Sequence, residues 1–176
     1  MRNWRTALDV GAHVGLWSMQ LVKRFRLVEA FEPLAAHRAC FLRNVPMEKV
    51  ILHACALGEA EGCVAMRTAP GSSGDSRVAG SPDGPGGAIP LRRLDAIMEG
   101  VDDVDFLKLD CEGYELFALR GGEALLQRCR PVVVVEQKPG KAQAFGLGER
   151  AAVAYLQGLG AELRDEIAGD YVLSWD

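Results

Sequence analysis

The stretch Ala7-Leu8-Asp9-Val10-Gly11-Ala12-His13-Val14-Gly15 decides the fold. Its apolar start predicts a buried strand, and the glycines that follow predict a tight turn into a helix. About twenty residues later, the segment 27–33 (Leu-Val-Glu-Ala-Phe-Glu-Pro) predicts a second strand that ends in a carboxylate. In an open α/β sheet, such a turn lets the backbone approach a nucleoside, and the carboxylate accepts the ribose hydroxyls. The two segments together predict a nucleoside-binding site.

The spacing of the glycines selects among nucleosides. A dinucleotide-binding turn would have glycine at positions 11, 13 and 16, where this chain has Gly11, His13 and Leu16. The pattern present is acidic-x-Gly-x-x-x-Gly, which is typical of S-adenosylmethionine (SAM) sites, where no pyrophosphate has to be held. It predicts SAM as the cofactor and methyl transfer as the reaction. The predicted cofactor-binding residues of this turn are Asp9, Gly11, Ala12, His13 and Gly15.

Two further segments complete the predicted cofactor site. Glu32 lies at the end of the second strand, where its carboxylate can accept both ribose hydroxyls, and Pro33 fixes the backbone as the chain leaves the sheet. After the third predicted strand, the backbone at Ala56 and Leu57 is placed to reach the adenine edge while an apolar side chain packs on the ring. The assignment of Ala56 and Leu57 depends on position alone.

A second candidate site follows the fourth predicted strand, where the sequence turns into a helix after Asp110 and Glu112. Carboxylates at this place lie beside the cofactor crevice, where the strand order reverses. Both are predicted catalytic residues, as a general base or hydrogen-bond partner for the methyl acceptor, and Asp110 is also a predicted cofactor contact. Two alternatives stay open, a divalent metal held by both carboxylates and a simple helix cap. We expect no metal. Glu136, after the fifth strand, lies on the same rim by position.

Composition limits the class of protein. The chain has 176 residues and a net charge of −4, which suits a single globular domain (1–176) and argues against nucleic acid as the main partner. No apolar stretch approaches the roughly 18 residues of a membrane span, and no export signal is expected. The five cysteines form no C-x-x-C pair, which favours a reducing, cytoplasmic location. Cys111 stands between carboxylates, which predicts a raised pKa and a poor nucleophile.

Apolar strands alternate with amphipathic helices, which predicts a parallel sheet covered by helices on both faces. The expected strands are 7–10, 27–31, 50–54, 104–109 and 131–136, and 161–164 and 171–175 form a possible terminal hairpin at the sheet edge. The expected helices are 16–23, 34–43, 94–99, 114–119, 123–128 and 149–159, with Gly160 closing the last one. The Gly/Pro/Ser-rich stretch 68–90 interrupts this order and predicts a flexible loop, either functional or disordered.

Several of these segments resemble the FkbM-type SAM-dependent methyltransferases. The resemblance rests on the turn after the first strand, on Phe31-Glu32-Pro33, on Ala56-Leu57-Gly58, on the segment 91–95 and above all on 104–121. Within the last segment, Lys108-Leu109-Asp110-Cys111-Glu112-Gly113-Tyr114-Glu115 is similar to the family's Lys-x-Asp-x-Glu-Gly-x-Glu signature. The resemblance extends from the first strand to at least Glu136.

The resemblance implies a Rossmann-like class I methyltransferase fold, with a mostly parallel seven-stranded sheet whose last strand is antiparallel. It implies in-line transfer of a methyl group from SAM to a hydroxyl oxygen of a small molecule or saccharide, leaving S-adenosylhomocysteine (SAH). Two departures bear on the acceptor pocket. Relatives often carry residues ahead of the first strand that help to cover the site, whereas this sequence reaches its first predicted strand at Ala7. Many relatives also have a histidine where this chain has Gln137.

Three other functions compete with this hypothesis. Methylation of nucleic acids or of other nitrogen acceptors is the nearest, but base-amine enzymes usually place an Asn/Asp-Pro-Pro-aromatic turn where this chain has Asp110-Cys111-Glu112-Gly113. A SAM-binding protein without catalysis is the second. An NAD-dependent oxidoreductase is the third, and the missing glycines disfavour it.

Overall fold

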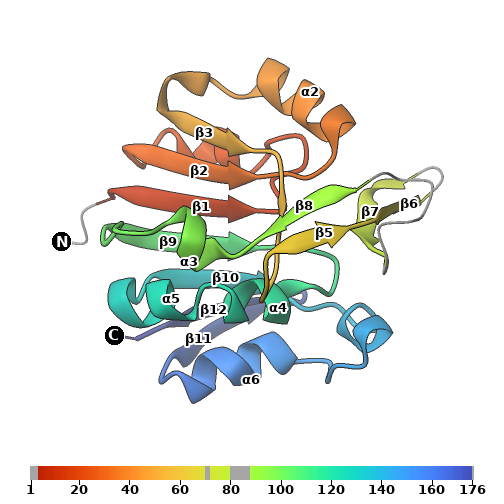
Figure 1. Ribbon diagram of the computed structural model, residues 1–176. Helices are drawn as coiled ribbons and strands as arrows, with labels where there is room; N and C mark the ends of the chain where they lie inside the picture. The colour runs from red at the N-terminus through yellow and green to blue at the C-terminus, as the bar shows by residue number, and fades with distance from the viewer. Residues whose placement is uncertain (1–3, 70–71, 80–87, 176) are drawn as a thin grey trace.

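The computed structural model describes residues 4–69, 72–79 and 88–175. Its main element is a seven-stranded sheet with the order β11-β12-β10-β9-β1-β2-β3 (Figure 1). In chain order these strands are β1 (Thr6–Val10), β2 (Leu27–Phe31), β3 (Val50–His53), β9 (Val104–Leu109), β10 (Val132–Glu136), β11 (Glu162–Ile167) and β12 (Asp170–Ser174). The expected class I methyltransferase fold is confirmed.

The direction of the strands places a crevice next to β1. β1 pairs in parallel with β2 on one side and with β9 on the other, so the chain order reverses at this strand. β12 is antiparallel to both β10 and β11, as expected for the last strand and for a terminal hairpin. Ligands of open α/β sheets bind at the carboxyl ends of the strands where the order reverses. The sheet therefore provides a binding position above β1 and β9.

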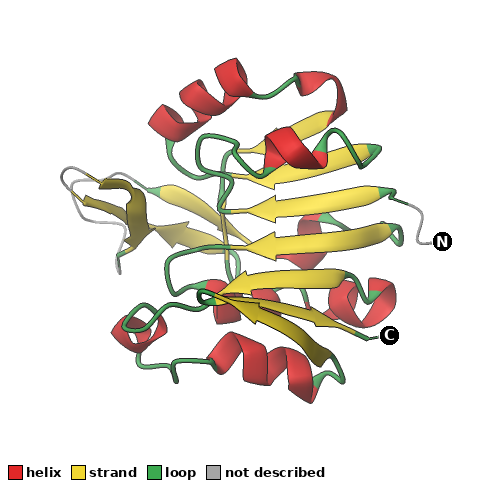
Figure 2. Ribbon diagram, turned by 180° about the vertical axis from the view of Figure 1, so that it is seen from behind, coloured by secondary structure: helices red, strands yellow, loops and turns green. Residues whose placement is uncertain are grey.

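Helices cover both faces of the sheet, as the alternating pattern predicted. On one face, α1 (Ser18–Leu21) and α2 (Ala35–Asn44) pack on β1 and β2 through a core that includes Leu21, Val28 and Phe41 (Figure 2). The other face carries α3 (Leu94–Ile97), α4 (Glu115–Arg120), α5 (Glu123–Cys129) and α6 (Ala151–Gly158) over a larger core. Two short 3-10 helices span Met47–Lys49 and Ala142–Phe145. None of the described helices is long and apolar enough to cross a membrane.

Two small sheets lie between β3 and α3, where the sequence predicted mostly loop. β4 (Ala56–Leu57), β8 (Ile89–Arg92) and β5 (Gly62–Val64) form one, and β6 (Met66–Ala69) and β7 (Ser72–Val78) form an antiparallel pair beside it (Figure 1). The prediction of a loop over 68–90 is therefore wrong for β7 and for the ends of β6 and β8. Among the described residues, these strands pair with one another and not with the central sheet, and they lack its long apolar runs. Residues 70–71 and 80–87 lie outside the described residues.

A cleft at the carboxyl ends of the central strands

A cleft lies above the carboxyl ends of β1, β2 and β9. It encloses about 720 Å³, including its open mouth, which is within the usual range for a site that holds a ligand of nucleoside size. Eight of the predicted site residues line it: Gly11, His13, Glu32, Pro33, Ala56, Leu57, Asp110 and Glu112. The remaining lining residues are Val10, Phe31, His37, Cys55, Met66, Ser76, Val78, Cys111 and Tyr114.

The glycine turn after β1 is tied to the neighbouring strands on both sides. Gly11 has a φ of +75°, and the N–H groups of Gly11 and Ala12 both donate to the carbonyl oxygen of Phe31, at 3.1 and 3.0 Å. On the other side, the Asp110 N–H donates to the Val10 oxygen at 3.1 Å. A Cβ added at Gly11 would lie 1.8 Å from the backbone oxygen of Asp110, so only glycine fits there. The turn thus forms the floor of the cleft, with its backbone packed against the ends of β2 and β9.

Glu32 is held with its carboxylate at the cleft wall. Its side chain is only 5% exposed. One oxygen accepts from the His13 N–H at 2.8 Å, and the other accepts from the Leu34 N–H at 2.8 Å and lies 3.3 Å from Nδ1 of His37. Each carboxylate oxygen has two acceptor positions, so Glu32 retains capacity for ligand hydroxyls. The sequence identified Glu32 and His13 but gave no signal for His37.

Three residues predicted to bind the cofactor do not line the cleft. Asp9 is fully buried and accepts a hydrogen bond from the Ser18 hydroxyl at 2.7 Å. Gly15 has a φ of +92°, and a Cβ there would come within 2.3 Å of Val45, so this glycine permits close packing of the loop against α2. Ala12 belongs to the apolar core under the turn. These residues build the turn, because the side chains of Asp9 and Ala12 are buried and Gly15 lets the loop pack against α2.

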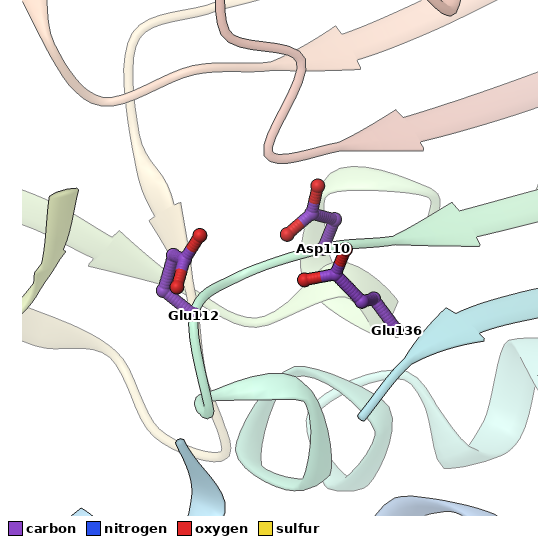
Figure 3. A group of neighbouring side chains, drawn as sticks. All are labelled: Asp110, Glu112 and Glu136. Carbon is purple, nitrogen blue, oxygen red and sulfur yellow. The ribbon is translucent and has the colours of Figure 1, made fainter. Parts of the chain in front are cut away.

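Two carboxylates that line the cleft, those of Asp110 and Glu112, lie close to a third, that of Glu136. Asp110 follows β9, Glu136 ends β10, and Glu112 lies in the turn after Asp110; Figure 3 shows their side chains facing one another. One oxygen from each lies within 4.8 Å of the other two. Glu112 has a φ of +57°, and the next residue, Gly113, has a φ of +100°. This left-handed turn directs the Glu112 carboxylate back toward Asp110.

Each of these carboxylates has a lysine partner. Asp110 lies 3.8 Å from Nζ of Lys108, Glu112 forms an ion pair with Lys141, and Glu136 forms one with Lys138. Three carboxylates at this spacing are also a possible ligand set for a divalent cation. The three ammonium groups compete with such a cation, because they already balance the negative charge. Burial raises the pKa of Glu136, and the neighbouring Asp110 raises it further against the opposing effect of Lys138.

A second buried glutamate supports the turn from below. Oε1 of Glu115 accepts from the backbone N–H groups of Cys111 at 2.8 Å and Gly113 at 3.0 Å. Burial raises the pKa of Glu115 to about 7, although these N–H groups oppose the shift. Burial also raises the pKa of Cys111 well above its usual value, and Glu115 and Asp110 add to this. The predicted rise in the pKa of Cys111 is confirmed, with burial as the main cause.

The raised pKa of Glu115 predicts a pH-dependent stability. The folded state holds this proton up to a pH of about 7, whereas the unfolded chain releases it near pH 4.5. The free energy of unfolding therefore decreases as the pH rises from 4.5 to 7, by up to about 3 kcal/mol from this group. Glu115→Gln, which keeps an acceptor for the N–H groups, is expected to remove this dependence. Urea unfolding at pH 5 and pH 8, with exposed Glu48→Gln as the control, measures it; an equal pH dependence in both variants would contradict the assignment.

The sequence profile described as "Methyltransferase FkbM domain" matches residues 9–167. The chain belongs to this family. Its members are SAM-dependent methyltransferases, so the cleft lies where the family's cofactor site is expected. A comparison with curated protein sequences found no match.

Solved structures with the same fold agree with the family. The methyltransferase FkbM from Methylobacillus flagellatus KT has a TM-score of 0.66 at 18% identity, over 98% of this chain and 43% of that protein. This FkbM domain thus spans less than half of the length of that relative. An rRNA methylase from Streptococcus thermophilus has a TM-score of 0.57 at 12% identity, over 99% and 87% of the two chains. A Streptococcus mutans methyltransferase in complex with SAH has a TM-score of 0.55 at 9% identity, over 96% and 86%.

One wall of the cleft in this FkbM domain includes part of the stretch 68–90, for which a functional loop was one of the two predicted alternatives. Met66 of β6 and Ser76 and Val78 of β7 line it, and Met66 and Val78 belong to an apolar cluster with Tyr114. The Tyr114 ring lies 4.5 Å from Phe117, measured between ring centroids. This apolar wall lines the same cleft as Asp110 and Glu112.

Proposed function

We propose that this FkbM domain transfers a methyl group from SAM to a hydroxyl oxygen of a small molecule or saccharide. The observation that carries the proposal is the presence of Glu32 and of the pair Asp110 and Glu112 in one cleft. The first is suited to a ribose, and the second is suited to a hydroxyl group. The five free cysteines support our expectation that the reaction takes place in a reducing cytoplasm.

The residues on the β1–β2 side fit the nucleoside part of SAM. Glu32 is fixed by two backbone N–H groups and still has acceptor positions for the ribose hydroxyls. The turn at Gly11 leaves room above the floor, and Ala56 and Leu57 offer apolar contact to the adenine ring. When bound, SAM supplies an electrophilic methyl group on a sulfonium. Asp9, Ala12 and Gly15 contribute by shaping the turn, and Pro33 by directing the chain away from the site.

The residues on the β9 side fit the acceptor. A hydroxyl loses its proton as its oxygen gains a methyl group, so a nearby base assists the in-line displacement. Asp110 and Glu112 both line the cleft and are therefore the candidates for this base. Glu112 is the stronger candidate, because its turn conformation is specified by Gly113 and by the backbone contacts to Glu115. The cleft walls position the hydroxyl and limit the access of water.

The direct test is methyl transfer from radiolabelled SAM to a panel of hydroxylated small molecules and saccharides. Products labelled on oxygen, identified by mass spectrometry, would support the proposal. Labelling of nitrogen acceptors only would favour an N-methyltransferase. Binding of SAM with no transfer to any acceptor, including amines and nucleic acids, would favour a SAM-binding protein without catalysis.

Changing Glu112 is expected to separate turnover from cofactor binding. Glu112→Ala and the isosteric Glu112→Gln should lower the turnover number by about 100-fold or more, since general-base catalysis typically contributes this much. The dissociation constant for SAM should change little, because Glu32, the expected acceptor for the ribose, follows β2 whereas Glu112 follows β9. Steady-state kinetics and calorimetry measure the two effects, with exposed Glu99→Ala as the control. Equal losses in turnover and affinity would contradict this division of roles.

A further inference from the structure

One buried residue beneath the cleft has no part in the function proposed above. Lys108 lies on β9 and is 4% exposed. Its Nζ donates to the carbonyl oxygens of Gly11 at 2.9 Å and Val10 at 3.3 Å. The same Nζ lies 3.4 Å from Asp9 and 3.8 Å from Asp110. A single ammonium therefore contacts both the glycine turn and the carboxylate that follows β9.

The surroundings keep Lys108 charged. Burial by itself lowers the pKa of a lysine, but the negative charges of Asp9 and Asp110 raise it more, so the net shift is upward. A buried charge is costly unless it is paired and hydrogen-bonded. Lys108 meets both conditions, since it has two carbonyl acceptors and two carboxylates around it. The ammonium is thus a permanent positive charge under the cleft floor.

The two carboxylates in contact with Lys108 differ in their exposure. The Asp9 side chain is fully buried and is also bound to Ser18, whereas the Asp110 side chain is 35% exposed and lines the cleft. Asp9 therefore fixes the ammonium from below, and the ammonium faces Asp110 from the floor. The charge of Asp110, which a ligand in the cleft would meet, is balanced by a buried cation that is also bound to Asp9 and to two backbone carbonyls.

We propose that Lys108 is a positioning residue for this site, which holds the glycine turn in place and balances the charge of Asp110. The inference rests on the proposed function. SAM carries a positive sulfonium, whereas SAH, the product, carries a neutral thioether. A negative Asp110 favours SAM over SAH, and the ammonium of Lys108 opposes this preference. Lys108 therefore limits how strongly the cleft distinguishes cofactor from product by charge.

The test removes the buried charges as a pair. Lys108→Met alone leaves Asp9 buried without its cation and is expected to destabilise the fold, so it is combined with Asp9→Asn, which keeps an acceptor for Ser18. Calorimetric titrations with SAM and with SAH then compare this double variant with the wild-type protein, and Asp9→Asn alone is the matched control. We expect SAH to bind at least about tenfold more weakly, because the carbonyl of Gly11 loses the Lys108 donor and the carbonyl of Val10 keeps only the N–H of Asp110. Relative to Asp9→Asn, from which the double variant differs only by the Lys108 charge, we expect the ratio of SAM affinity to SAH affinity to rise at least about fivefold.

A purely structural role for Lys108 gives a different result. Equal weakening of SAM and SAH, or unchanged binding of both, would overturn the proposal. Should the double variant fail to fold, Lys108→Gln combined with Asp9→Asn removes the same two charges but keeps an amide donor for the carbonyl of Gly11. Its ratio of SAM affinity to SAH affinity is then expected to exceed that of Asp9→Asn alone, and an unchanged ratio would overturn the proposal. A wild-type protein that binds neither SAM nor SAH would instead contradict the proposed function itself.

Discussion

Replacing Glu32 with alanine is expected to weaken the binding of both SAM and SAH by about 100-fold or more. Hydrogen bonds to a charged group contribute about 1.5–3 kcal/mol each, and the carboxylate is placed to accept two ribose hydroxyls. The substitution also removes the acceptor for the N–H groups of His13 and Leu34, so the wall of the cleft loses its anchor. Isothermal calorimetry with purified protein measures the affinities.

The comparison with Glu32→Gln makes this test sharper. Glutamine keeps one oxygen that can accept from a backbone N–H, but it has no charge and only one acceptor oxygen. We expect Glu32→Gln to bind SAM and SAH with affinities between those of the wild type and of Glu32→Ala. Its midpoint of urea unfolding should be closer to the wild-type value than that of Glu32→Ala. Wild-type affinity in both variants would show that Glu32 only supports the chain and that the nucleoside lies elsewhere.

Gly11→Ala is expected to destabilise the protein by at least about 4 kcal/mol, a loss seen only for severe steric or packing defects. The added Cβ would meet the backbone oxygen of Asp110 at 1.8 Å, and backbone cannot move aside as the end of a flexible side chain can. The variant should also lose SAM binding, because β1 and β9 must separate near the cleft floor. Urea unfolding and calorimetry report the two effects.

Gly100 provides a matched control for this substitution. It has a φ of +74°, almost the same as Gly11, but a Cβ there would meet nothing within 4 Å. Gly100→Ala therefore carries only the left-handed backbone strain, about 1–2 kcal/mol. The difference between the two alanine variants measures the collision alone. Similar losses in both would mean that β9 can shift to accept a side chain at position 11.

The sequence predicted the central sheet well and the peripheral strands poorly. β2 (Leu27–Phe31) and β9 (Val104–Leu109) have the predicted bounds, because strands covered on both faces are apolar runs bounded by polar residues. β7 (Ser72–Val78) has glycine, serine and charged residues and was missed. Its strand conformation depends on pairing with β6, and cross-strand pairing leaves little trace in such a sequence.

The sequence also predicted the candidate site in part. Glu32, Asp110 and Glu112 were found because each follows a recognisable strand, and the structure brings all three to one cleft. Asp9 was also predicted to bind the cofactor, but it lies within β1 and faces into the protein. Its direction depends on contacts with Ser18 and Lys108, which lie 9 and 99 positions away in the chain and cannot be anticipated from the turn itself. His37 was missed because the sequence of α2 does not show which of its side chains reach the cleft once the helix packs on the sheet.

The bond between Lys108 and the carbonyl of Val10 joins residues that are 98 positions apart in the chain. During synthesis, the cleft floor is incomplete until β9 has been made and has inserted beside β1. A ligand of this cleft thus selects the folded state as a whole over partly folded chains. Such a ligand raises the thermal midpoint by mass action, in proportion to the logarithm of its concentration at saturation. Thermal-shift screening of hydroxylated compounds in the presence of SAH is therefore a practical way to search for the acceptor.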